Sequence, residues 1–575
     1  MIYKKSIVVL LMALISLPAW GLQAFHETSS RFHATKGMQG VVAAQEAVAA
    51  RIGVNILKQG GNAVDAAVAT SFALMVTLPR AGSLGGGGFI MIALKDEKYQ
   101  PRFVDFREVA PGKAASTMML DAKGGVNIDQ LKHSWLAVGV PGNVAGLCYV
   151  EQHYGNLTLQ QVLQPAIDMA SNGIVVEPYL AKALAEYHSL LSSNPATKKM
   201  FTRPDGQLYQ QGDLMRRPDL AKSLKLIQQY GPKVFYEGEI ARKIAQASEQ
   251  GGGYISMDDL RNYKVLERKP INGIVSGYHI FAAPPPSSGG VTLLQILRIL
   301  GEFPLDSSHV AQNSAAEYHL LAEVFNRVFL DRNSYLGDPD FEVNPIAALL
   351  SSKHIDAVAK HIDTQKHIPS RVLTSSSPMS NEGYNTTQVS TLDKDGSMAS
   401  LTYSINFSYG SGISVPGTGI LLNNTMLDFT LLPNHADKNH SALGQKNTIE
   451  PNKRPLSSMN PVIVLDAQGM PWLATGSPGG PQIITTVAQL FINLLYYHLP
   501  LAEATEQPRI HVQLFPDMLY YESGISVDTL SLLAKMGHAM KQSSAMGSLQ
   551  TVMHDSNGYW GFSDTRREGA FVATY

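Results

Sequence analysis

The sequence predicts an α+β fold in which sheets pack together beneath helical covers. Two observations lead to this prediction. Hairpin patterns, with alternating apolar residues and turns through Gly, Asp or Asn, recur at residues 89–108, 387–407, 461–475 and 549–562. Helical patterns separate these hairpins, and they lie at residues 157–172, 219–230, 238–249, 293–302, 312–331, 481–498 and 526–537.

The composition limits the kinds of partner. The chain has 575 residues, of which 45% are hydrophobic and 16% are charged, and its formal net charge is −1. This balance argues against nucleic-acid binding by a basic face, and no aromatic-plus-basic motif occurs. We therefore expect a small molecule or a peptide as substrate.

Residues 1–21 have the pattern of a secretory signal. Two lysines precede the apolar stretch "SIVVLLMALISLPAWG", which ends in small residues around Gly21. The stretch is too short for a stable membrane span and is soon followed by the polar "HETSS". We expect an exported protein, periplasmic or secreted, whose mature chain begins near Leu22, with cleavage after Ala24 as the second option.

The cysteine and histidine content predicts no metal site. Cys148 is the single cysteine, so it cannot form an internal disulfide, and a buried, inert thiol is expected. No "HExxH" or "CxxC" motif occurs. His354, His361 and His367 lie in a charged helical stretch at spacings that do not converge, which indicates a surface helix.

Two helices followed by a glycine run are predicted near the start of the mature chain. Residues 45–78 read as two helices that are separated at Gly60–Gly61, with Asn62 capping the second. The run "AGSLGGGGFIMIAL" lacks the Lys-Ser/Thr of a P-loop and leads into a strand. Its glycines therefore indicate a close approach of backbone rather than nucleotide binding.

The segment "GYNTTQVSTLDKDG", residues 383–396, contains a candidate nucleophile. The hydroxyl of Thr386 is a weak nucleophile unless a base takes its proton, and an α-amine with a pKa of about 8 is suitable. Only a threonine that begins a chain carries both groups. Attack of Thr386 on the carbonyl of Asn385 would give an ester whose hydrolysis leaves that free end, and the polar stretch 374–385 reads as an exposed loop open to cleavage.

Other interpretations of this segment remain open. Asn385-Thr386-Thr387 is also a glycosylation sequon. The same residues also suit a simple junction between a loop and a strand, because threonine favours strands.

Gly479 and Gly480 form a second candidate feature, because they directly precede Pro481 and a long apolar helix. Free backbone N–H groups at the start of a helix bind anions, so these two amides could form an oxyanion hole. A tight turn without catalytic function is the alternative.

A third set of polar residues suits a zwitterionic substrate. The planar guanidinium of Arg107 matches a carboxylate, and the hydroxyls of Ser457 and Ser458 could add donors. Asp428 and Asn406 could accept hydrogen bonds from an ammonium group. Taken singly, each of these residues is better explained as a surface or turn residue.

Taken together, these motifs resemble those of the γ-glutamyltransferases (glutathione hydrolases), N-terminal-nucleophile enzymes made as one proenzyme. The likeness runs over nearly the whole mature chain, through "LKQGGNAVDAAVA", "AGSLGGGGF", "VDFREVAPGKA", "GVPGNVAGL", "APPPSSGG", "NTTQVSTLDKDG", "GILLNNTMLDF", "PNKRPLSSMNPVIV" and "TGSPGGPQIITT". The resemblance implies a four-layer αββα sandwich and self-cleavage at Asn385–Thr386. It also implies a large subunit, 22–385, and a small subunit, 386–575, that together form one intertwined catalytic domain.

The resemblance also implies a role for each candidate residue. Thr386 is the nucleophile and supplies the amine base. The family places the oxyanion amides at Gly479 and Gly480, and a hydroxyl that supports the nucleophile at Ser404, where threonine is usual. It assigns the glutamyl α-carboxylate to Arg107, Ser457 and Ser458, and the α-amino group to Asn406 and Asp428.

The sequence departs from the family pattern beside Asp428. Thr425 stands where Gln or Glu is typical and would be a shorter partner for the ammonium, and Leu427 replaces a common Asp. The stretch 431–452 corresponds to the loop over the pocket and lacks the aromatic residue found in many members. Loss of one ammonium partner would cost about 1–3 kcal/mol if the group stays buried and unpaired.

The resemblance implies that Thr386 cleaves the γ-glutamyl amide of glutathione and related compounds. The glutamyl group then passes to water, or to an amino acid or peptide, without a metal or organic cofactor. One alternative is a glutaryl (cephalosporin) acylase, against which Asp428 argues and for which Thr425 leaves room. Another is a non-catalytic exported protein that binds γ-glutamyl peptides, against which the full set of chemical residues argues.

Overall fold

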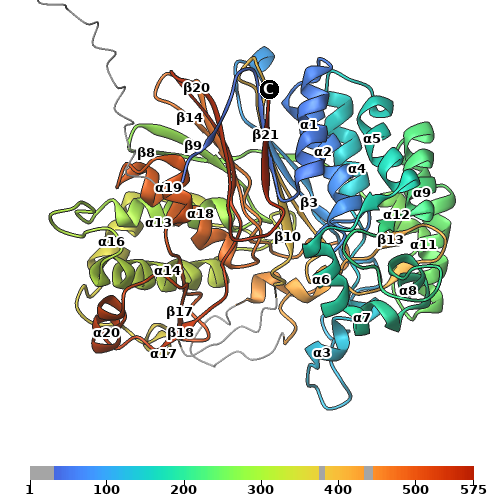
Figure 1. Cartoon of the computed structure of the whole chain (residues 1–575). Helices are drawn as coiled ribbons and strands as arrows, with labels where there is room; N and C mark the ends of the chain where they lie inside the picture. Colours follow the sequence, from blue (N-terminus) through green and yellow to red (C-terminus); the bar gives the residue numbers. More distant parts are fainter. Residues whose placement is uncertain (1–31, 375–381, 433–443) are drawn as a thin grey trace, which may run out of the picture.

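The computed structural model describes residues 32–374, 382–432 and 444–575, and in it two seven-stranded sheets stack between layers of helices (Figure 1). The predicted signal segment with its cleavage sites therefore lies outside the described residues, as do parts of the loops 374–385 and 431–452. Among the described helices, none combines the length and apolar character needed to cross a bilayer.

The first sheet carries the candidate nucleophile, and all of its neighbouring strands pair antiparallel. Its order is β21 (Phe571–Thr574), β2 (Val41–Ala44), β10 (Thr386–Leu392), β11 (Met398–Ser404), β3 (Gly87–Ala93), β4 (Arg102–Phe106) and β7 (Leu266–Arg268). The second sheet is also antiparallel. Its order is β1 (Thr35–Gly37), β20 (Gly558–Ser563), β19 (Gln550–Asp555), β15 (Pro471–Thr475), β14 (Val462–Leu465), β9 (Tyr278–Ala282) and β8 (Ile271–Val275).

Helices cover the outer face of each sheet (Figure 1). On the first sheet they are α1 (Ala47–Lys58), α2 (Ala63–Thr77) and α4 (Asn143–Tyr154), and α5 (Leu159–Asn172) packs against α2 and α4. On the second sheet they are α13 (Gly289–Leu300), with α14 (Ala315–Tyr335) and α18 (Gln482–Leu495) beside it. The arrangement is the αββα sandwich that the resemblance implies.

Smaller elements surround this sandwich. The helices are α3 (Ile128–Leu131), α6 (Pro178–Glu186), α7 (His188–Ser193), α8 (Pro195–Phe201), α9 (Pro218–Tyr230), α10 (Lys233–Tyr236), α11 (Glu239–Gln250), α12 (Met257–Asn262), α15 (Ile346–Leu349), α16 (Ser352–Lys360), α17 (Ser370–Leu373), α19 (Leu501–Glu506) and α20 (Val527–Lys535). The strands are β5 (Ile174–Val175), β6 (Leu214–Met215), β12 (Ser414–Val415), β13 (Ile420–Leu421), β16 (Ile510–His511), β17 (Leu519–Tyr521) and β18 (Met540–Gln542).

The central strands of the first sheet are buried on both faces, and two of them, β2 and β3, have nearly continuous apolar sequences. In β2, Val41 and Ala43 belong to the core that includes the second sheet, whereas Val42 and Ala44 face the core beneath α1 and α2. Successive side chains of a strand point to opposite faces, so both sets must be apolar. The predicted hairpins and the seven predicted helices are confirmed, with shifts of a few residues at their ends.

The glycine run serves the close backbone approach that the sequence predicts. A Cβ at Gly88 would clash with the carbonyl oxygen of Thr402, and one at Gly86 with that of Ser404. Strand β3 can therefore lie against β11, the strand that ends at Ser404. The predicted helix break is also confirmed, since α2 begins after Asn62, whose side chain accepts from two backbone amides.

Two expectations about single residues have different outcomes. Cys148 is buried in α4, and burial raises the pKa of its thiol, as expected for an inert cysteine.

The prediction that His367 lies on a surface helix is wrong. His367 follows α16, is only 8% exposed, and contacts Glu323 of α14. This contact joins distant parts of the chain, so the local charge pattern did not reveal it.

A buried acidic pair lies where α2 meets the end of α4. Asp65 accepts backbone N–H bonds from Asn62, Asn156 and Leu157 at 2.6–2.9 Å. Glu151 lies beside it, and burial together with the charge of Asp65 raises the pKa of Glu151 to about 10. The folded state therefore keeps Glu151 protonated at neutral pH, whereas the unfolded chain ionises it.

We expect Glu151→Gln to change how the stability of the protein depends on pH. The stabilisation from a protonated Glu151 is complete below pH 4.5 and is lost as pH rises towards about 10. The free energy of unfolding should therefore fall as pH rises over this range. The variant should lack this slope in urea unfolding between pH 5 and 9. The exposed Glu249→Gln is the matched control, and an unchanged slope in Glu151→Gln would contradict the assignment.

Candidate active site

One cavity brings together most of the residues that the sequence singled out. Its walls come from the start of β10, the end of β11, the residue after β4, the 3₁₀ turn Thr425–Asp428, the loop before β14 and the residues before α18. It is lined by Arg107, Glu382, Gly383, Thr386, Ser404, Asn406, Asp428, Ser457, Ser458, Met459, Gly480 and Ile483. Gly479 adjoins this set, and Thr425 does not line the cavity.

Thr386 and Ser404 face each other across the pairing of β10 and β11. The hydroxyl of Thr386 donates to Oγ of Ser404 at 3.3 Å, and Ser404 donates to the carbonyl oxygen of Asn385 at 2.9 Å. The backbone N–H of Asn406 donates to Ser404 Oγ at 2.8 Å and fixes its position. The chain is continuous through Asn385–Thr386. The hydroxyl of Ser404 therefore contacts both the candidate nucleophile and the carbonyl group that this nucleophile would attack.

Gly479 and Gly480 adopt backbone conformations that suit only glycine. Their φ angles are +133° and +56°, in the region that L side chains rarely occupy. Helix α18 begins directly after them, with Pro481 as its N-cap. Within the described ranges neither glycine N–H has an acceptor. Two backbone donors are therefore without a partner at the edge of the cavity that Gly480 lines together with Thr386, as an oxyanion hole would require.

Arg107 is buried between two carboxylates. It is 2% exposed, and it donates to Glu108 Oε2 at 3.0 Å and to Asp428 Oδ2. Burial raises the pKa of Asp428 above its usual range, although the charge of Arg107 opposes the rise. The second oxygen of Asp428, Oδ1, is buried without a partner, so it could accept from a substrate ammonium. The alternative explanation of Arg107 and Asp428 as surface residues is therefore wrong.

The hydroxyls of Ser457 and Ser458 also lie in the cavity wall. Ser457 Oγ accepts the backbone N–H of Met459 at 3.1 Å. Ser458 Oγ accepts from Nη2 of Arg332 at 3.1 Å. Both side chains are nearly fully buried, which keeps their hydroxyls in fixed positions.

Sequence reasoning missed Arg332 and Glu382. Arg332, at the end of α14, donates to Ser288 Oγ at 2.9 Å, to Ser458 and to the carboxylate of Glu382. Before cleavage, the carboxylate of Glu382 therefore lies in the wall of the cavity. Arg332 lies in an ordinary helical pattern, so its own sequence surroundings did not mark it as a site residue. The motif "APPPSSGG" contains its partner Ser288 and was the one local feature that pointed to these contacts.

The residues that depart from the family pattern have local structural roles. Thr425 is fully buried and donates to Asn423 Oδ1 at 2.7 Å. Leu427 belongs to an apolar cluster that includes Ala110 and Phe429. The side chain of Thr425 is therefore engaged away from the cavity in this structure, and its proposed contact with a substrate ammonium stays a prediction.

Comparisons with known proteins show the family of this chain. The family model described as Gamma-glutamyltranspeptidase matches residues 49–574. The "Glutathione hydrolase proenzyme" of Escherichia coli (strain K12) is 43% identical over 95% of this chain and 93% of its own length. Among solved structures, a cephalosporin acylase from Bacillus halodurans has a TM-score of 0.82 and 27% identity, over 96% of this chain and 98% of that one.

A second solved structure, the gamma-glutamyltranspeptidase of Helicobacter pylori, is 38% identical with a TM-score of 0.54, and the match covers 56% of this chain and 91% of that one. The family model spans most of the described residues, and the relative from Escherichia coli extends over nearly the entire sequence. The chain therefore belongs to the gamma-glutamyltranspeptidase family.

Proposed function

We propose that this chain is a proenzyme that cleaves itself at Asn385–Thr386 and then uses Thr386 to cleave γ-glutamyl amides. Its family and its full-length relatives make it a glutathione hydrolase and γ-glutamyltransferase. The single observation that carries the residue assignment is the contact from Thr386 through Ser404 to the carbonyl of Asn385.

Self-cleavage follows from this contact. The Thr386 hydroxyl oxygen adds to the carbonyl carbon of Asn385 while Ser404 donates to the carbonyl oxygen. The C–N bond then breaks, and the hydroxyl proton passes to the nitrogen of Thr386, which becomes a free amine. Water hydrolyses the resulting ester. The products are a large subunit, 22–385, and a small subunit, 386–575.

The same hydroxyl then serves the reaction with substrate. The new α-amine takes the proton of the Thr386 hydroxyl, whose oxygen attacks the γ-amide carbonyl of glutathione. The N–H groups of Gly479 and Gly480 stabilise the oxyanion. The dipeptide leaves with the proton, a γ-glutamyl ester remains on Thr386, and water or the amine of an amino acid or peptide then removes the glutamyl group.

Substrate recognition requires opposite charges at one end of the cavity. Arg107, Ser457 and Ser458 would hold the α-carboxylate, and the unpartnered Oδ1 of Asp428, with Asn406, would hold the α-ammonium. Glu382 and Gly383 line this cavity while the chain is continuous. Cleavage gives their segment a free end at Asn385, which allows it to leave the cavity for substrate.

A glutaryl acylase is the second candidate, because the fold matches a cephalosporin acylase closely. A glutaryl group carries the carboxylate but no ammonium. The buried and unpartnered oxygen of Asp428 would then have no partner in the complex, which is costly. This favours γ-glutamyl substrates.

We also propose that residues 1–21 direct export and are removed. N-terminal sequencing of the secreted or periplasmic protein should begin near Leu22. A first residue at Met1 in the exported protein would contradict this proposal.

Thr386→Ala should leave one uncleaved chain and lower γ-glutamyl turnover by about a thousandfold or more, because nucleophile and base are both lost. The measurements are a denaturing gel, sequencing for T-T-Q-V-S, and release of nitroaniline from a γ-glutamyl nitroanilide. Thr387→Val is the matched control, since the Thr387 hydroxyl is buried without a partner. Normal processing of Thr386→Ala would refute the scheme.

Ser404→Ala should slow the appearance of the small subunit by about a hundredfold, because the Asn385 carbonyl loses its hydroxyl donor. Ser404→Thr keeps the hydroxyl and should process at close to the normal rate. The measurement is the time course of cleavage on a denaturing gel. Equal rates for both variants would exclude a role of this hydroxyl in processing.

Asp428→Asn should reduce kcat/KM for a γ-glutamyl anilide relative to a glutaryl anilide by about tenfold to a hundredfold, because the substrate ammonium loses its charged partner. The ratio of the two substrates is measured because Asp428 also pairs with Arg107. Asp258→Asn, at an exposed position, is the control. An unchanged ratio, or faster glutaryl cleavage by the unmodified protein, would favour the acylase.

A further inference from the structure

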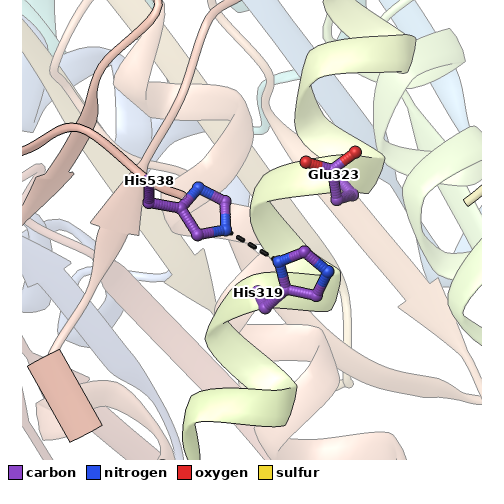
Figure 2. Close-up of side chains that lie close together, drawn as sticks. All are labelled: His319, Glu323 and His538. Carbon is purple, nitrogen blue, oxygen red and sulfur yellow. Dashed lines mark hydrogen bonds between the residues drawn. The ribbon is translucent and has the colours of Figure 1, made fainter. Parts of the chain in front are cut away.

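A second polar cluster lies in the core, away from the cavity. His319 and Glu323 project from one face of α14, and His538 faces them from the segment between α20 and β18 (Figure 2). One ligand atom from each residue can be chosen so that all three lie within 4.8 Å of one another. At 1.5 Å rise per residue, His319 lies about 20 Å along the helix from Arg332, at the active-site end.

The two imidazoles converge through their nitrogens. His319 Nδ1 and His538 Nε2 are 2.8 Å apart, and His319 Nε2 contacts the backbone oxygen of Asp363 at 2.7 Å. The carbonyl can only accept, so His319 donates from Nε2, and in the neutral ring Nδ1 then turns a lone pair towards His538. A ring nitrogen whose opposite N–H is held by a carbonyl is the usual setting of a metal-ligating histidine.

Glu323 completes the set one helical turn beyond His319. Its Oε1 accepts from His367 at 2.6 Å and from the backbone N–H of Ile368 at 3.2 Å. Its Oε2 accepts from Arg327 at 2.7 Å and keeps a second lone pair that could ligate an ion. All three candidate ligands are nearly fully buried. Their positions are thus fixed by packing before any ion binds.

We propose that His319, Glu323 and His538 bind one Zn²⁺ ion. Two imidazole nitrogens and a carboxylate oxygen are ligands that zinc accepts, with water in the fourth position. In the absence of the ion, His538 Nε2–H donates to His319 Nδ1. Binding replaces this proton by the ion and releases the proton to solvent.

Charges of both signs surround the three candidate ligands. Arg327 and His367 face Glu323 and oppose a dication. Asp517, which contacts His367 Nε2 at 3.2 Å and is 32% exposed, adds negative charge and lies at the solvent side of the network.

The ion would join two parts of the chain. His319 and Glu323 precede Asn385, and His538 follows it. The zinc would therefore link the large and small subunits at a point far from the nucleophile, a consequence that rests on the self-cleavage proposed above. Its role is in holding the subunits together and not in turnover.

The test uses the full chain, stripped with chelator and dialysed against Zn²⁺ alone. We expect one bound zinc per chain by elemental analysis, and Co²⁺ should give the visible absorption of a four-coordinate site. His538→Gln keeps an N–H donor for His319 but should weaken zinc binding about a hundredfold or more. His309→Gln, at an exposed histidine, is the matched control. No zinc on the unmodified chain, or full binding by His538→Gln, would overturn the proposal.

A second measurement separates this proposal from the proposed function. Zinc should raise the urea concentration at which the two subunits separate, and His538→Gln should abolish the increase. The Thr386→Ala chain, which would not be cleaved, should still bind one zinc. Zinc binding with normal processing of Thr386→Ala would refute self-cleavage alone, whereas processing as proposed without zinc binding would refute the metal site alone.

Discussion

The antiparallel register that pairs Thr386 with Ser404 is the constraint on which the active site depends. It places a hydroxyl where it contacts both the nucleophile and the carbonyl before it. The glycines of β3 let a third strand lie against β11, so that Ser404 is held from its other side. A shift of the register by one residue would turn both side chains to the opposite face of the sheet. The two-sided core makes such a shift costly, because every strand position is buried.

The binding end of the cavity is built from buried charges. A single guanidinium, that of Arg107, lies between Glu108 and Asp428, and a second one, that of Arg332, holds Glu382 and Ser458. Buried ionic groups are costly to desolvate and contribute little net stability. Here these ion pairs fix the positions of the two guanidinium groups, because neither group can turn away without leaving a buried carboxylate unpaired.

Much of the fold could be predicted from the sequence because its signals are local. Alternating apolar residues marked the hairpins, and Asn62 after two glycines marked the start of α2. The residues of the cavity could be predicted once several motifs were considered together, and Arg107 and Asp428 do meet. Arg332, Glu382 and His367 could not be predicted, because each has its role through contacts with residues more than 40 positions away. Thr425 could not be placed either, since its contact depends on the turn of one short 3₁₀ segment.

The central position of β10 has a consequence for the enzyme after processing. The first residues of a polypeptide are ordinarily its least ordered part. Here the new terminus would begin a strand that pairs with β11 along its whole length and with β2 over its second half. The reactive end itself would pair on one edge, with Ser404 of β11, while β2 holds the other edge from Val389 onwards. This pairing would limit fraying of the freshly cut chain and keep the amine beside the hydroxyl that it activates.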